Sequence, residues 1–357
     1  MNDETVKNNY PEYIEKVFEF EVTPGQAGER VDVFLTRNIR NATRNKVQKA
    51  IEGGTVTVND KNVKSNKKLN AGDKVRCVLM KPPPIELLPE NIPLHIEYED
   101  EHLLIVNKPS GMVTHPAFGN RYGTLVNAVL YHLGFRESIK IEPETEDDED
   151  LEQEILLSDK VRPGLVHRLD KETSGLLLIT KNPEIQPLIA KQFYDRKIVK
   201  LYKALVWGRF KNEHDIIESN IGRSKRDRKL FAVVKNEGKP AKTEFWVEKR
   251  FMYMSLVKIK LWTGRTHQIR VHFSHMNRPL VGDEQYGGDT VRIGGNNTEF
   301  RKVAAKILEN TQGQMLHAYS LEFEHPVTKK RMLVESSLPE NFNYAMELLN
   351  DFDLVHG

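Results

Sequence analysis

The stretch Gly164–Lys181, GLVHRLDKETSGLLLITK, joins a charged loop to a continuous apolar strand. In the loop, Asp170 lies between the basic pair His167-Arg168 and Lys171. Cationic neighbours favour the ionised carboxylate, so Asp170 could serve as a nucleophile without a separate base. Because most aspartates in charged loops are merely solvated, the stretch by itself leaves a catalytic and a solvated interpretation open.

Two other segments are typical of strands next to this loop. KLYKALVWG, residues 200–208, places Tyr202 on the same face as Ala204 and Val206. A tyrosine on such a face is ordinarily a core residue with its hydroxyl satisfied. EHLLIVNKPSGMVTHP, residues 101–116, predicts an apolar strand followed by a turn, which either lines a cleft or has only a structural role.

A fourth segment, GRTHQIRVH at residues 264–272, is rich in histidine and arginine. His267, His272 and His275 are separated by five and three residues, a spacing that matches no recognised ligand pattern. We therefore expect no metal site here. Arg265 and Arg270 better suit a phosphate or a carboxylate partner.

The order of predicted elements indicates an α+β fold for the larger part of the chain. Closely spaced strands without intervening helices favour a long, mixed and mainly antiparallel sheet. Helices are predicted at TLVNAVLYHLG, PEIQPLIAKQFYDR and THQIRVHFSHM. Neither a GxxxxGKS/T nor a GxGxxG loop is present, so we expect no nucleotide cofactor.

Residues 18–81 predict a small N-terminal module. Apolar spacing predicts helices over Val31–Ile39 and Ala42–Glu52, a hairpin around Asn59-Asp60, and a closing strand at Val75–Leu79. RVDVFL, TRNKVQKAIEGGTVTVND and AGDKV resemble the RNA-binding domain named after small-subunit ribosomal protein four, the S-four domain. The resemblance implies that basic side chains contact structured RNA, namely Arg37, Arg40, Arg44, Lys46, Lys49, Lys67 and Lys68.

Charge is distributed unevenly along the 357 residues. The formal net charge is only +2, yet residues 30–81 hold 13 Lys and Arg against 4 Asp and Glu. Residues 142–159 hold 10 acids and no basic residue, whereas residues 223–242 hold 8 basic residues and 2 acids. Any single run could be a solvated face, but this segregation favours a polyanion-binding surface.

The composition also indicates the cellular compartment in which the protein is expected. Cys77 is the only cysteine, so no intrachain disulfide or cysteine cluster can form and a reducing, cytoplasmic location is expected. The start of the chain lacks the pattern of a signal peptide, and no apolar run approaches the ~18 residues that span a bilayer. We expect no membrane partner.

The four segments described first, together with two further motifs, resemble the RluA-type family of RNA pseudouridine synthases in their order along residues 99–339. NKPSGMVTHP, GLVHRLDKETSGLLLITK, KLYKALVWG, GRTHQIRVH, RPLVGDEQYG and LHAYSLEFEHP carry the resemblance. It implies the pseudouridine synthase fold, a long sheet with flanking helices and a central cleft. It also implies isomerisation of uridine in RNA without a cofactor, with the target base flipped out of its stack.

Individual roles follow only from this resemblance. Asp170 matches the essential aspartate, and Tyr202 matches the active-site tyrosine that could take the proton from uracil carbon 5. Arg265 is expected to pair with Asp170 and hold it ionised. Ile269 would pack on the uracil, and Arg168 would fill the gap left by the flipped base. Weaker candidates for phosphate contact or cleft structure are Arg270, Lys108 and His115, and His167 is a further candidate for substrate binding.

The predicted organisation is a tail at 1–17, the S-four-like module at 18–81, a proline-rich linker at 82–98, a catalytic domain at 99–340 with an acidic insert at 136–160, and a C-terminal tail at 341–357. The expected partner is ribosomal RNA of the large subunit or its precursor, with tRNA as the alternative substrate, and the chain is expected to act as a monomer. Two other classes remain open: a non-catalytic assembly factor, and a hydrolase that uses Asp170 as a nucleophile.

Overall fold

The computed structural model describes residues 14–39, 42–81, 85–116, 120–141, 164–227 and 229–357. Residues 14–86 belong to one compact unit, and most of those from 87 onward belong to a second. Arg40 and residues 142–160 of the predicted acidic insert lie outside the described residues. Within the described part of the chain, no helix has the length and apolar character needed to cross a membrane.

The N-terminal unit is a four-stranded sheet, in the order β1-β4-β2-β3, with two helices packed on one face. Buried side chains of α1 and α2 share a core with alternate residues of β4, such as Val75 and Cys77. The hairpin is where the sequence predicts it, since Asn59 and Asp60 both have a positive φ, as a tight hairpin turn requires. The elements are β1 (Ile14–Glu21), η1 (Pro24–Gln26), α1 (Val31–Asn38), α2 (Arg44–Glu52), β2 (Val56–Val58), β3 (Lys61–Asn62) and β4 (Lys74–Lys81).

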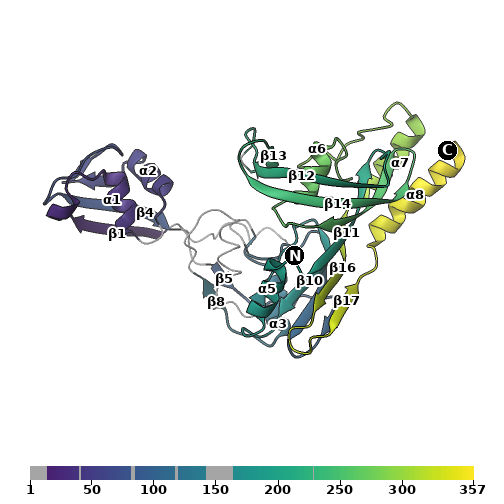
Figure 1. Cartoon of the computed structure of the whole chain (residues 1–357), viewed down its shortest axis with the longest axis horizontal. Helices are drawn as coiled ribbons and strands as arrows, with labels where there is room; N and C mark the ends of the chain where they lie inside the picture. The colour runs from purple at the N-terminus through teal and green to yellow at the C-terminus, as the bar shows by residue number, and fades with distance from the viewer. Residues whose placement is uncertain (1–13, 40–41, 82–84, 117–119, 142–163, 228) are drawn as a thin grey trace, which may run out of the picture. The chain divides into compact units, whose positions relative to one another are not determined.

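The second unit is built on an 11-stranded sheet, in the order β13-β12-β14-β15-β11-β16-β10-β7-β6, with β17 paired to β16 and β9 to β10 (Figure 1). The pairing between β10 and β16 is parallel and the others are antiparallel, so the predicted mixed, mainly antiparallel sheet is confirmed. Its strands are β6 (Ile96–Glu99), β7 (Leu103–Lys108), β9 (Gly164–Leu165), β10 (Ser174–Thr180), β11 (Val199–Trp207), β12 (His214–Arg223), β13 (Phe231–Val234), β14 (Lys239–Arg250), β15 (Met254–Leu261), β16 (Leu316–Glu324) and β17 (Arg331–Glu335).

Helices cover both faces of this sheet. On the face that carries Tyr202, α5 packs through Ile189 on Leu321 of β16, and α6 packs through Phe273 on Phe245 of β14. On the opposite face, α7 and α8 share a core with Trp207 of β11. The helices are α3 (Leu125–His132), α5 (Gln186–Tyr194), α6 (Gln268–His275), α7 (Thr298–Glu309) and α8 (Glu340–His356).

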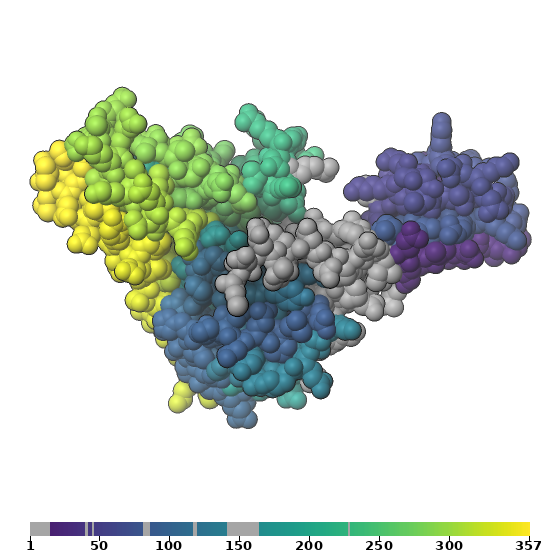
Figure 2. Space-filling view, turned by 180° about the vertical axis from the view of Figure 1, so that it is seen from behind, coloured from purple at the N-terminus to yellow at the C-terminus, as the bar shows by residue number. Residues whose placement is uncertain are grey.

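The C-terminal segment differs from its prediction. Residues 341–357 are predicted as a tail, but they form α8, which buries Phe342, Leu349 and Phe352 in the core shared with α7. In Figure 2 this yellow segment lies directly against the green region that precedes it. The apolar residues recur every three or four positions, the spacing that one face of a helix requires.

The predicted linker and insert also contain regular structure. Strand β6 begins at Ile96 and joins the long sheet, so the end of the 82–98 segment belongs to the second unit. A separate two-stranded sheet pairs β5 (Ile85–Leu87) with β8 (Ile139–Ile141), the latter inside the predicted insert. The domain boundaries themselves stay predictions.

Candidate active site

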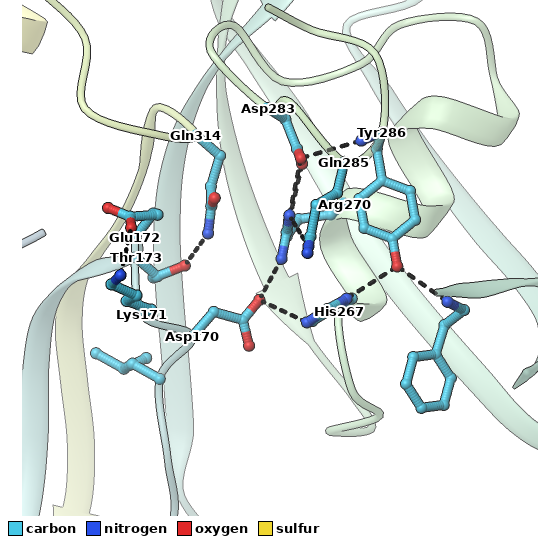
Figure 3. A network of polar contacts seen from close by, with 12 residues as sticks. Asp170, Lys171, Glu172, Thr173, His267, Arg270, Asp283, Gln285, Tyr286 and Gln314 are labelled. Carbon is cyan, nitrogen blue, oxygen red and sulfur yellow. Dashed lines mark hydrogen bonds and ion pairs between the residues drawn. The ribbon is translucent and has the colours of Figure 1, made fainter. Parts of the chain in front are cut away.

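Asp170 forms its ion pair with an arginine of α6. Arg270 Nη1 donates a hydrogen bond to Asp170 Oδ2 at 3.2 Å (Figure 3). The expected pairing with Arg265 is therefore wrong, because Arg265 Nε donates to the carbonyl of Pro240 instead. Asp170 sits in the loop between β9 and β10, and α6 brings Arg270 to it from 100 residues further along the chain.

Arg270 is itself held in place by a buried carboxylate. Asp283 accepts two hydrogen bonds of 2.8 Å from Arg270, one from Nε and one from Nη2. Gln285 Oε1 accepts a third from Nη2 at 2.8 Å, and the guanidinium lies 4.9 Å from the centre of the Tyr286 ring. A bidentate pair fixes the plane of the guanidinium, so only Nη1 is directed at Asp170.

His267 forms a second contact with Asp170. Its Nε2 lies 3.9 Å from Asp170 Oδ2, while its Nδ1 lies 2.9 Å from the hydroxyl of Tyr286, which also accepts from Phe231 N (Figure 3). His267 has a φ of 54°, in the left-handed region. Such strain in a residue other than glycine concentrates at functional sites.

The surroundings of Asp170 keep it ionised. Burial alone would raise its pKa, but His267, Arg270 and Arg168 outweigh burial and hold the pKa of Asp170 below its usual value. Burial lowers the pKa of His267, so this histidine is mostly neutral near pH 7. The permanent positive charges are consequently those of the two arginines.

Tyr202 lies on the site face of β11 and is 5% exposed. Burial, with a smaller effect of Asp170, raises the pKa of its hydroxyl, so Tyr202 is a neutral phenol. Its hydroxyl makes no hydrogen bond with any residue that the structure describes. The usual explanation of a buried tyrosine, a hydroxyl already satisfied in the core, does not apply here.

Lys108 is not a surface contact for phosphate. Its side chain is fully buried, and Nζ donates to the carbonyls of Pro109, Met112 and Lys171 at 2.8–2.9 Å. Of the two roles expected for Lys108, phosphate contact is wrong, because all three ammonium hydrogens are used inside the protein, and its contacts agree with a structural role. Lys108 joins the turn after β7 to the loop that carries Asp170.

Replacing this lysine should loosen that loop. In Lys108→Met, the three carbonyls lose their donor while the aliphatic volume is kept, so we expect the free energy of unfolding to fall by about 2 kcal/mol. Urea denaturation measures this change. The matched control is Lys171→Met, an exposed lysine of the same loop, which should change stability by less than about 0.5 kcal/mol. Equal stability of the two variants would contradict the assigned role.

The other predicted substrate contacts differ in their placement. His115 is fully buried without a hydrogen-bond partner among the described residues, and burial together with Arg168 lowers its pKa to about 3. His167 Nε2 accepts from Leu178 N, and its ring packs on Phe193. His115 is therefore a buried neutral group and His167 a partly buried neutral group, so neither offers a positive charge to a phosphate. Ile269, 4% exposed, and the partly exposed Arg168 remain predictions.

Residue-by-residue sequence reasoning missed the residues that align Arg270. Asp283, Gln285 and Tyr286 lie in RPLVGDEQYG, a segment that carried the family resemblance without a role for any single residue. Gln268 was also missed. Its Oε1 accepts from Arg265 N and Thr263 Oγ1, and its Nε2 donates to Lys242 O and Thr243 Oγ1. The signal available in the sequence was an acid or an amide in a turn next to arginines, because a buried polar group needs such a partner.

The histidines of the GRTHQIRVH segment have partners other than a metal. His272 contacts Thr243 Oγ1 and Ser219 Oγ at 2.9 and 3.0 Å, and burial lowers its pKa to about 4. Over the described ranges, no group of three His, Cys, Asp or Glu residues could hold a metal ion. The site consists of an ionised carboxylate, a guanidinium and a phenol, which suits acid–base or nucleophilic chemistry.

In the N-terminal unit, a buried carboxylate gathers basic residues. Asp32 accepts from Arg30 and Arg44 at 3.0–3.2 Å, and Arg30 forms a β-bridge with Lys68. The basic patch defined by Arg30, Arg44, Lys67 and Lys68 is exposed or partly exposed. Among the other predicted contacts, Arg37 pairs with Glu29, Lys49 is exposed, Lys46 is partly exposed, and Arg40 is not described.

Comparison with known proteins gives a consistent result for both units. Residues 102–275 match the family described as RNA pseudouridylate synthase, and residues 29–75 match the S4 domain. An uncharacterized RNA pseudouridine synthase of Chlorobaculum parvum is 43% identical over 92% of this chain and 96% of its own length. The solved structure of human RNA Pseudouridylate Synthase Domain Containing 4 has the same fold, with a TM-score of 0.53 and 20% identity over 72% of this chain and 93% of that one.

The same comparison gives relatives with named substrates. The ribosomal large subunit pseudouridine synthase D of Pseudomonas aeruginosa is 36% identical over 90% of this chain and 92% of its own length. The protein of that name from Neisseria meningitidis is 37% identical over 90% of this chain and 79% of its own length. The similarity to synthase D that the sequence predicts, from its N-terminal module and from LLPENIPLHIEYEDEHLLIVNKP, is thereby confirmed.

Proposed function

Because this chain belongs to the family of RNA pseudouridine synthases, we propose that it isomerises uridines of large-subunit ribosomal RNA and that Asp170 is its catalytic carboxylate. The observation that carries the assignment of Asp170 is its side chain, which Arg270 holds and which its cationic neighbours keep ionised. Asp170 also raises the pKa of Tyr202, whose hydroxyl makes no hydrogen bond with any described residue. The S4 domain and the named relatives support the choice of RNA.

The reaction needs no redox group. The bond between uracil nitrogen 1 and the ribose breaks, the uracil rotates, and carbon 5 bonds to the same ribose carbon. The hydrogen of carbon 5 leaves as a proton and nitrogen 1 gains one, so atoms and electrons balance. Ionised Asp170 serves either route to this end, by attack on the ribose or by removal of the 2′ proton through a glycal.

Tyr202 is assigned a different role from the one the sequence suggests. Removal of the carbon 5 proton needs a base, and a phenol whose pKa is raised by burial is a poor one at neutral pH. A neutral hydroxyl without a partner is well suited to contact the uracil. We propose that Tyr202 orients the base and that Arg168, on the Asp170 loop, occupies the space left by the flipped nucleotide.

Tritium release tests the proposed reaction. Ribosomal RNA labelled at uracil carbon 5 should release tritium to water with the wild-type protein, and the mass of the RNA should stay the same. Loss of mass would instead indicate a hydrolase. Binding without tritium release would indicate an assembly factor. Release from tRNA alone would show that tRNA, not ribosomal RNA, is the substrate.

The cytoplasmic location and the monomeric state stay predictions.

The basic patch should contribute to RNA affinity. We expect Lys67→Gln/Lys68→Gln to bind large-subunit RNA about tenfold more weakly. The slope of log affinity against log salt should fall by about 0.7–0.9 for each lost phosphate contact. The matched control is Lys74→Gln/Arg76→Gln, which removes two charges from the β4 face that points away from the helices. Equal losses in both variants would show a general charge effect.

A further inference from the structure

Lys200 is a partly buried cation that the site chemistry described above does not use. It lies two residues before Tyr202 on β11, and because side chains alternate along a strand, both point to the same face of the sheet. Its Nζ makes no hydrogen bond or ion pair with any residue in the described ranges. An unpaired charge that is partly removed from water is costly, so it indicates a missing anion.

The surroundings of Lys200 place it beside the catalytic segments. Its Nζ lies 5.2 Å from the centre of the Phe193 ring, and His167, three residues before Asp170, packs on the same ring. A Cβ at Gly264, the first residue of GRTHQIRVH, would lie 3.9 Å from Nζ. Lys200 is thus adjacent to both loops that supply the polar groups of the site.

Two other cations near Asp170 are engaged within the protein. Arg270 is occupied by Asp283, Gln285 and Asp170, and Lys108 by three carbonyls. Burial without a compensating acid lowers the pKa of Lys200 to about 8. A phosphodiester would supply the absent negative charge and raise this pKa again on binding.

We propose that Lys200 binds a phosphate of the RNA strand next to the target uridine, through a charge-assisted hydrogen bond from Nζ to a non-bridging oxygen. The inference rests on the proposed function and extends it by a residue that positions the strand. A point charge on a flexible stem suits a phosphate better than the shaped edge of a base.

Three substitutions test the contact on labelled RNA. Lys200→Gln should raise the KM about tenfold with kcat within about twofold, and it should lower the salt slope of binding by about 0.7–0.9. Lys200→Arg should keep wild-type affinity. The matched control is Lys203→Gln, on the opposite face of the same strand, where Nζ pairs with Glu248 at 3.0 Å. The control should leave KM and the salt slope unchanged.

The pH dependence gives a readout that a purely structural lysine would not show. Only protonated Lys200 binds phosphate, so the affinity of the wild type should fall as pH rises from 7 to 9, through the pKa of about 8. The groups that face Lys200 are His167 and Phe193, and His167 is neutral over this range because its pKa lies well below the usual value. Lys200→Arg should remove the dependence.

The outcomes separate the two proposals. If the wild type releases no tritium, the proposed function fails before Lys200 is tested. If the wild type is active while Lys200→Gln keeps the wild-type KM, salt slope and pH dependence, Lys200 binds no phosphate. An unfolded Lys200→Gln variant is recognised by circular dichroism, and in that case Lys200→Arg decides through its loss of pH dependence.

Discussion

Asp170→Asn should release tritium from labelled RNA at least about a thousandfold more slowly than the wild type. The amide keeps the size of the side chain but cannot attack the ribose or accept a proton. Arg270 stays anchored by Asp283, so the loop should keep its position. We therefore expect the loss in kcat, with RNA affinity and the midpoint of urea unfolding nearly unchanged.

The control for Asp170→Asn is an aspartate far from the site in sequence. Asp351 is exposed on α8, and Asp351→Asn should keep full activity. An Asp170→Asn variant that retains more than about a tenth of wild-type kcat would mean that another group carries the reaction. Weaker RNA binding as the sole effect would make Asp170 a binding residue.

Asp283→Asn should be the most damaging change among residues that do not contact substrate. Asp283 is 1% exposed, and its two hydrogen bonds fix the Arg270 guanidinium. Removal of one partner from a buried ion pair costs about 3 kcal/mol of stability. Misdirection of Arg270 should in addition lower kcat about a hundredfold, because small displacements of a catalytic group are costly.

The pH profile separates alignment from simple instability. Arg270 lowers the pKa of Asp170, so a displaced Arg270 should let that pKa rise. In folded Asp283→Asn, activity should therefore be lost at a higher pH than in the wild type when the solution is acidified. The control is Glu284→Gln, an exposed neighbour, which should match the wild type in stability and in profile. An unchanged acid limb in Asp283→Asn would contradict the alignment role.

Local sequence patterns predicted most of the strands, because alternating or continuously apolar residues suit a strand with one or both faces buried. The residues of β7, β10 and β11 alternate or run continuously apolar, and the structure places all three in the long sheet. The C-terminal helix α8 was predicted as a tail although its apolar residues recur at helical spacing, because the core it packs against is not visible in the sequence. Propensity without a packing partner does not distinguish such a helix from a tail.

The sequence predicted which residues form the site better than it predicted which of them pair with one another. Asp170 and Tyr202 were both predicted from the family resemblance, and the charge of Asp170 contributes to the raised pKa of Tyr202. The choice between Arg265 and Arg270 depended on geometry: after a left-handed His267, α6 starts at Gln268 and turns Arg270 toward Asp170. Sequence spacing gives no direction to a side chain at a loop-to-helix junction.

Buried polar residues were the least predictable. Lysines are rarely fully buried, and the sequence left phosphate contact and cleft structure open for Lys108. Three converging carbonyls explain its burial, and one of them, that of Lys171, is 63 residues further along the chain. Likewise, Asp283 can align Arg270 only where the two side chains meet, and only the fold brings these two residues together.

The most direct test of the central claim compares pseudouridines in whole-cell RNA with and without this protein. Carbodiimide mapping of ribosomal and transfer RNA should show one or more sites in large-subunit RNA that are lost when the gene is deleted. A plasmid copy of the wild type should restore these sites, and a copy with Asp170→Asn should not. An unchanged pattern after deletion, or restoration by Asp170→Asn, would contradict the account.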